Sequence, residues 1–292
     1  MAMNNSFNVS PFDGGEYYMS IAYLAAWQGP VLEEDDPYGD NQTVNGLSAV
    51  KHLEEAIILK DKNYEAIKSS VYKYGGVETV IYCDMKNATS SSYYYNRNRS
   101  SYYYDGDQTP NHDVVIVGWD DNYPKEYFNT EPAGDGAFIC KNSWGQDFGD
   151  EGFFYISYYD TNIGMNSVVY TKLGNSDNYD KIYQSDLMGE VGTMGFDDRP
   201  EAYFANVYTA GKNETLKAVS FYATGPKTTY DVYVVTDFTD VSDLQQRTKV
   251  ASGEMQYEGY YTINLKEAVP LPDDRKFAVV VHVNTQDSTC LL

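Results

Sequence analysis

Residues 111–119 read NHDVVIVGW, and residues 141–145 read KNSWG. The first stretch places His112 at the start of a β-branched run that is typical of a strand. The second places Asn142 where another apolar run ends in a Ser-Trp-Gly turn. An imidazole can act as a general base, and an amide can orient the ring without adding charge. The two stretches therefore predict a catalytic base and its orienting partner.

The segments around these stretches predict a few helices and several strands. Apolar residues recur at helical spacing over residues 16–27, and a second helix is predicted through residues 63–74, ending at Gly75-Gly76. Strands are predicted from β-branched and aromatic content at residues 77–85, 113–120, 136–144 and 152–160. This mixture predicts an α+β domain over residues 1–172.

The composition shifts after residue 172. Residues 173–181 read LGNSDNYDK, which is typical of a linker. Short alternating strands with turn signals then follow at residues 203–210, 215–224, 230–237, 259–265 and 276–283. Strands at this spacing with little helix predict an all-β sandwich over residues 180–292.

Residues 90–110, SSSYYYNRNRSSYYYDGDQTP, have no usable helical or strand period. We expect a long surface loop. Its tyrosines either offer flat contact area or form a merely solvated insertion.

Charge and hydropathy exclude several classes of protein. The net charge of −22 disfavours nucleic acid as a partner, because a phosphate backbone would be repelled. No apolar run is long enough to span a membrane. Residues 1–12 lack the basic and apolar regions of a signal peptide.

The three cysteines are Cys83, Cys140 and Cys290. An odd number at wide spacing predicts neither a disulfide framework nor a zinc site. Cys83 and Cys140 lie in apolar, strand-like runs, so we expect both to be buried structural thiols.

Four blocks of sequence, between about residues 13 and 160, resemble the papain family of cysteine peptidases in the order of that family. They are DGGEYYMSIAYLAAWQGPVLEEDDPY, EAIKSSVYKYGGVETVIYCDM, NHDVVIVGWDD and GAFICKNSWGQDFGDEGFFYIS. The resemblance implies a Cys-His-Asn mechanism in which His112 carries protons, Asn142 orients its ring and Trp144 shields the pair from water. It also implies supporting roles for Ser143 and Gly145, and cleft or substrate-binding roles for Gly14, Gly15, Asn111 and Asp113.

The strands after residue 180 resemble the lectin-like domain that follows the peptidase in some bacterial cell-surface cysteine peptidases. This resemblance implies a protein or peptide substrate, a cell-surface glycan as a further partner, and an extracellular or cell-surface location. Tyr260 and Tyr261 are candidate glycan platforms, although strand alternation would place one inward and one outward.

The expected nucleophile is missing. The papain family places it in a Cys-Trp helix motif about 130–150 residues before the histidine, and no Cys-Trp pair exists in this chain. Neither Cys83 nor Cys140 has a helix N-terminus to lower its thiol pKa. We therefore expect the nucleophile and the oxyanion-hole glutamine to lie upstream, so that this chain is a fragment and inactive alone.

Two alternatives stay open. One is a non-catalytic pseudo-peptidase and lectin-like module that binds protein or carbohydrate. The other is a split enzyme whose nucleophile helix comes from another chain.

No cofactor is predicted. The acidic runs at residues 33–36 and 197–198 offer hard oxygen ligands. A calcium ion is left open, in particular in the lectin-like domain, which contains residues 197–198.

Overall fold

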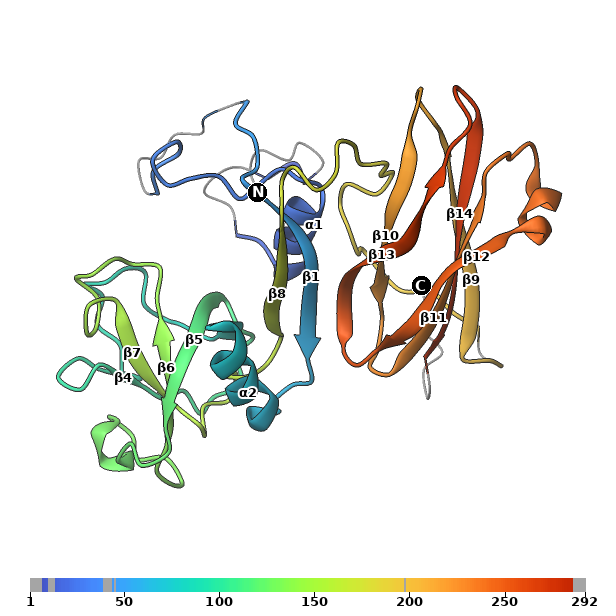
Figure 1. Cartoon of the computed structure of the whole chain (residues 1–292). Coiled ribbons are helices and arrows are strands. Elements are labelled where there is room, and N and C mark those ends of the chain that lie inside the picture. Colours follow the sequence, from blue (N-terminus) through green and yellow to red (C-terminus); the bar gives the residue numbers. More distant parts are fainter. Residues whose placement is uncertain (1–6, 10–13, 39–43, 45, 197, 286–292) are drawn as a thin grey trace. The chain divides into compact units, whose positions relative to one another are not determined.

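The computed structural model describes residues 7–9, 14–38, 44, 46–196 and 198–285. Its contacts divide the chain into two compact units (Figure 1). Unit 1 comprises Met1–Ile57 and Thr171–Leu292, and unit 2 comprises Ile58–Tyr170. This division rests on packing alone, so the domain boundaries predicted from the sequence, 1–172 and 180–292, stay a prediction.

Unit 2 is a sheet with a helix packed against it (Figure 1). Its strands follow the order β2-β5-β6-β7-β4-β3, and the first residues of β8 lie beside β2. Neighbours are antiparallel except for β4 and β7, which are parallel. The elements are α2 (Tyr64–Tyr74), β2 (Val77–Ile81), β3 (Tyr95–Asn96), β4 (Ser101–Tyr102), β5 (His112–Asp120), η1 (Lys125–Tyr127), β6 (Ala137–Lys141), β7 (Phe153–Ser157) and β8 (Ser167–Asn175).

Helix α2 begins and ends where the sequence predicts. The Asn63 side chain accepts a hydrogen bond from the Ala66 N–H at 3.2 Å, which caps the first turn. Gly75 ends the helix in the left-handed conformation, with φ of 93°. Ile67 and Val71 are buried on one face, so tertiary packing adds to the local signals.

The register of β5 and β6 positions both residues of the predicted pair. His112 opens β5 and pairs with Ile81 of β2. Ile116 pairs with Cys140 of β6, and a bulge follows before Gly118. Asn142 comes directly after β6. Because β5 and β6 are antiparallel, the start of β5 and the end of β6 lie at the same end of this strand pair.

The tyrosine-rich segment 90–110, which we expected to be a long surface loop, contributes strands and buried side chains to the core. β3 and β4 pair within it, and Tyr95, Tyr102 and Tyr104 are buried. The Tyr102 hydroxyl donates to the Tyr82 carbonyl at 2.7 Å, which satisfies its polar end inside the core. Tyr93, by contrast, is exposed, so burial increases from Tyr93 through the half-buried Tyr94 to Tyr95 within one tyrosine triplet.

Unit 1 contains α1 (Tyr17–Ala25) and two sheets that face each other (Figure 1). One sheet has the order β10-β13-β1-β8, and the other has the order β12-β11-β14-β9. The bounds are β1 (Lys51–Leu59), β9 (Glu201–Thr209), β10 (Thr215–Ala223), β11 (Thr228–Val235), η2 (Val241–Gln246), β12 (Thr248–Met255), β13 (Glu258–Pro270) and β14 (Lys276–Thr285).

Besides β3 and β4, three longer strands are absent from the sequence prediction. β1 carries His52 and Glu54 among its buried residues, so its apolar pattern is interrupted. β12, TKVASGEM, has weak strand propensity and forms by pairing with β11. β8 runs into the segment that we predicted as a linker.

The aromatic residues Tyr260 and Tyr261 are both buried in β13. The prediction that one of them points outward is wrong, and neither can offer a ring face to a glycan.

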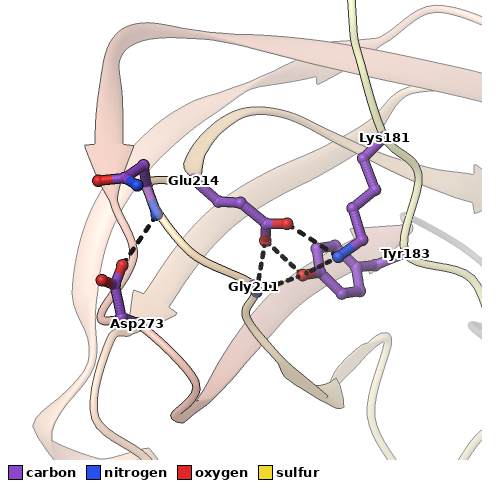
Figure 2. Close-up of polar contacts among 6 residues, drawn as sticks. Lys181, Tyr183, Gly211, Glu214 and Asp273 are labelled. Atoms are coloured by element: carbon purple, nitrogen blue, oxygen red, sulfur yellow. Dashed lines mark hydrogen bonds and ion pairs between the residues drawn. The ribbon is translucent and has the colours of Figure 1, made fainter.

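A polar cluster fixes the segment before β9 to the turn before β10 (Figure 2). Glu214 accepts hydrogen bonds from the Lys181 ammonium at 2.8 Å, from the Tyr183 hydroxyl and from the Gly211 N–H at 2.8 Å. These three donors hold the pKa of Glu214 at about 2, below its usual range.

Candidate functional site

His112 and Asn142 are joined by a hydrogen bond. His112 Nε2 lies 2.9 Å from Asn142 Oδ1. The Ser143 N–H donates to the same Asn142 atom at 2.8 Å, which identifies that atom as the amide oxygen. An amide oxygen only accepts, so the neutral His112 ring must carry its proton on Nε2.

The remaining ring nitrogen is available for chemistry. Among the described residues, His112 Nδ1 has no hydrogen-bond partner. Asn142 is buried, whereas His112 is half-buried. The pair therefore holds the imidazole from its buried side and leaves Nδ1 able to accept a proton.

Trp144 packs on this pair. Its ring centroid lies 5.0 Å from that of His112, with the planes tilted by 37°. Phe148 supports Trp144 edge-on at 5.1 Å and stacks on Tyr95 at 5.2 Å. Phe148 thus holds the Trp144 indole in place, and the indole covers part of the surface beside the His112–Asn142 hydrogen bond.

The turn after β6 is closed by backbone hydrogen bonds. The Asn142 N–H donates to the Gly152 carbonyl at 3.0 Å, and the Gly152 N–H donates to the Phe148 carbonyl at 2.7 Å. Gly145 and Gly152 have φ of 77° and 92°, which favours glycine. Ser143 and Gly145 are exposed in this turn.

The other predicted site residues are distributed as follows. The Asn111 amide bridges the backbone of Cys83: it accepts from the Cys83 N–H at 2.7 Å and donates to the Cys83 carbonyl at 3.1 Å. This use of Asn111 holds the residues before β5 against the end of β2. Asp113 is exposed on β5. Gly14 and Gly15 are exposed in unit 1, and their cleft role stays a prediction.

The two described cysteines are poor nucleophiles. Cys140 is fully buried and Cys83 is almost fully buried. Burial raises the pKa of the Cys83 thiol to about 11 and that of Cys140 well above its usual value. Cys290 lies outside the described residues.

The calcium prediction stays open. Within the part of the chain that the structure describes, no group of three or more His, Cys, Asp or Glu side chains could hold a metal ion. Asp197, part of one predicted acidic run, lies outside the described residues.

Sequence reasoning missed residues that support the site indirectly. Phe148 and Gly152 hold Trp144 and Asn142 in place. Apart from the site, sequence reasoning also missed the burial of Asp160, which accepts hydrogen bonds from the N–H groups of Tyr104, Asn162 and Ile163. The YYDTN sequence around Asp160 shows a polar residue after a strand, which by itself is only a turn signal.

No helix among the described residues is both long and apolar enough to cross a membrane.

Two family models match successive parts of the chain. A model of the papain family cysteine proteases matches residues 6–173, and a model of the lectin-like domain matches residues 182–292. Among curated proteins, no sequence matches the chain.

Two solved structures are similar to most of the chain. One is a variant of the clostridial cysteine protease Cwp84 after propeptide cleavage, with 27% identity and a TM-score of 0.83; the match covers 94% of this chain and 68% of that chain. The other contains the cysteine protease and lectin-like domains of Cwp84, a surface layer associated protein of Clostridium difficile, with 28% identity and a TM-score of 0.79. That match covers 94% of this chain and 61% of that chain, so this chain spans less than two thirds of its length.

Proposed function

Because the chain belongs to the papain family of cysteine proteases and carries a lectin-like domain, we propose that it supplies the base and orienting residue of a peptide-bond hydrolase. The observation that supports this proposal is the hydrogen bond between His112 Nε2 and Asn142 Oδ1, beside the Trp144 ring.

The proposed reaction uses the open nitrogen of His112. His112 Nδ1 takes the proton of a cysteine thiol, and the resulting thiolate attacks the carbonyl carbon of a peptide bond. The protonated ring then gives its proton to the departing amine, leaving a thioester. Water hydrolyses the thioester and returns the thiol, with His112 as the base again. Asn142 keeps the ring in the tautomer that this sequence needs.

The nucleophile is proposed to come from a cysteine other than Cys83 and Cys140. Both thiols are buried, and their raised pKa values disfavour the thiolate. On this proposal the chain by itself hydrolyses no peptide bond.

The substrate and the location are also proposals. Papain-family membership and the likeness to a surface layer associated protein support a protein substrate at or outside the cell surface. If the chain also binds a glycan, we propose that residues other than His112 make that contact.

The decisive experiment begins upstream of the chain. We would sequence the source DNA for about 150 codons before Met1, looking for an in-frame Cys-Trp motif. If it is present, the longer protein is expected to hydrolyse casein, and His112→Ala should lower kcat at least about a thousandfold. His282→Ala is the matched control, because His282 lies on β14 in unit 1.

Two results would contradict the proposal. One is a longer protein whose hydrolysis survives His112→Ala. The other is a stop codon close upstream together with no activity when a Cys-Trp helix peptide is titrated into the chain. The second result would favour the binding-module alternative.

A further inference from the structure

Strand β9 forms one edge of the four-stranded sheet in unit 1 (Figure 1). Among the described residues, its only strand partner is β14. Every second residue of β9 therefore directs its backbone N–H and C=O towards the free side. Such an edge can pair with a strand of another molecule, and most proteins protect their sheet edges against this.

The exposure of consecutive side chains shows that β9 is uncovered. Successive residues of a strand point to opposite faces of the sheet. Ala205 and Asn206 are both exposed, so at this level the described residues cover neither face of β9. On the same face as Ala205, Tyr203 is 51% exposed and Val207 is 40% exposed. The strand thus offers an accessible, mostly apolar face beside its free backbone groups.

The other sheet edges among the described residues have features that hinder pairing. β3 is only two residues long. β10 carries Lys217 where its pairing with β13 is irregular, and β12 carries Lys249 beside a bulge at Val250. β9 has none of these features: its nine residues pair with β14 without a shift, and it contains no lysine, arginine or proline. Of the described edges, β9 is therefore the one best suited to accept a further strand.

The sequence of β9 fits a second copy of itself. In an antiparallel pair centred on Ala205, each residue faces the one that lies equally far from Ala205 in the second copy. Tyr203 then faces Val207 of the second copy, and Ala205 faces its own counterpart. An aromatic ring opposite a β-branched side chain is a favourable cross-strand pair, and two alanines leave room for it. On the other face, Phe204 meets Asn206, which opposes no charges.

The charges at the two ends of β9 are also complementary in this arrangement. Glu201 opens the strand, whereas Thr209 at the other end pairs with the exposed Lys276 of β14. Antiparallel pairing places Glu201 of one copy in the same row as Thr209 and Lys276 of the other, so opposite charges lie one strand apart. No two like charges face each other along β9. This matters because each chain has a net charge of −22.

Two side chains of the exposed face are held in place without a partner. His282 Nε2 lies 3.2 Å from Glu201 Oε2. The Tyr203 ring stacks on the His282 ring, with centroids 4.2 Å apart and planes tilted by 18°. Side chains that are already ordered lose less entropy when a second molecule binds them.

We infer that β9 is a self-association edge: two copies of the chain pair their β9 strands antiparallel, centred on Ala205, and join their four-stranded sheets into one continuous sheet. A second copy is favoured over an unrelated strand because the side chains around Ala205 match about a two-fold axis and the end charges are opposite. The inference does not depend on peptide-bond hydrolysis. Its failure would leave the proposed role of His112 untouched.

The test measures the self-association of the whole chain by sedimentation equilibrium. In about 0.5 M NaCl, which screens the net charge, we expect a monomer–dimer equilibrium. Its Kd should lie below about 200 µM, so chain concentrations up to about 500 µM are measured. In about 0.05 M NaCl the Kd should rise at least about threefold, because the repulsion between the two acidic chains is less screened.

Substitutions of Ala205 test the pairing register, because this position faces itself in the dimer. Ala205→Lys and Ala205→Glu each place like charges opposite one another and should raise the Kd at least about tenfold. An equal mixture of the two variants should dimerise again, because the facing charges are then opposite. Ala205 is exposed, so both variants should fold, which circular dichroism checks. Ser252→Lys is the matched control, at an exposed position of the other edge strand, β12, and should leave the Kd unchanged.

Three results would overturn the inference. The first is a wild-type chain that stays monomeric over the whole concentration range in the high-salt buffer. The second is a Ser252→Lys variant that weakens association as much as Ala205→Lys does. The third is a mixture of Ala205→Lys and Ala205→Glu that associates no better than either variant alone.

Discussion

Oδ1 of Asn142 lies 2.9 Å from Nε2 of His112, although the residues are 30 positions apart in the chain. The strands β5 and β6 bring them together: His112 opens one strand, and Asn142 follows the other. The same oxygen also accepts from the Ser143 N–H. The orientation of the His112 imidazole is therefore coupled to the closed turn after β6. We make four predictions, some about this site and some about the fold.

Asn142→Ala should release the His112 ring. Without the amide oxygen, the Nε2–H tautomer loses its acceptor, and nitrogen-detected NMR should show a larger share of the Nδ1–H form. The Ser143 N–H loses its acceptor too, so we expect the free energy of unfolding to fall by about 1–3 kcal/mol. Asn129→Ala, at an exposed position, is the control. An unchanged tautomer ratio would show that Asn142 does not orient the ring.

Trp144→Ala should expose the His112–Asn142 hydrogen bond to water. The Nε2 proton of His112 is then expected to exchange faster with solvent, because the indole no longer covers the pair. Trp144→Phe keeps an aromatic ring against Phe148 and should retain much of the protection. Equal exchange rates in all three proteins would contradict a shielding role for Trp144.

Cys83 and Cys140 should resist alkylation in the folded chain. Burial blocks access, and the raised pKa of each thiol keeps the reactive thiolate scarce. Peptide mapping after iodoacetamide treatment near pH 8 should find neither residue modified, whereas both should react in urea. Rapid labelling of Cys83 or Cys140 in the native chain would reopen their candidacy as nucleophiles.

Glu214→Gln should destabilise the chain in a pH-dependent way. The pKa of Glu214 is about 2 in the folded protein, below its ordinary value of 4.5. Its contribution is therefore present above pH 4.5 and is lost as the pH falls towards 2. Urea unfolding at pH 6 should separate the two proteins, and the separation should shrink between pH 5 and pH 3. A separation that stays constant with pH would show that the Glu214 charge is unimportant.

The sequence predicted those helices and strands whose start, end or apolar pattern is encoded by their own residues. Helix α2 has its own cap at Asn63 and its own stop at Gly75. β5 and β6 have apolar, β-branched runs that identify them as strands. These signals were sufficient to predict where His112 and Asn142 lie in their elements, because each depends on neighbours within a few positions.

Prediction failed where burial depends on distant partners. Glu54 reads as a surface residue, yet it is buried in β1 because Lys172 pairs with it from β8. Tyr102 lies in a polar repeat, yet it is buried because its hydroxyl donates a hydrogen bond to the Tyr82 backbone carbonyl. A polar group can enter a core when it is paired, and the sequence does not show its partner.

The sequence by itself determined the family resemblance, the residue types of the base and its orienting partner, and the absence of a Cys-Trp pair from this chain. The tertiary structure decided which atoms meet: Nε2 rather than Nδ1 of His112 on Asn142, Phe148 behind Trp144, and Glu54 beside Gly174. The physical reason is that residue type is local, whereas contact, burial and hydrogen-bond pairing are set by strand register and packing between segments far apart in the chain.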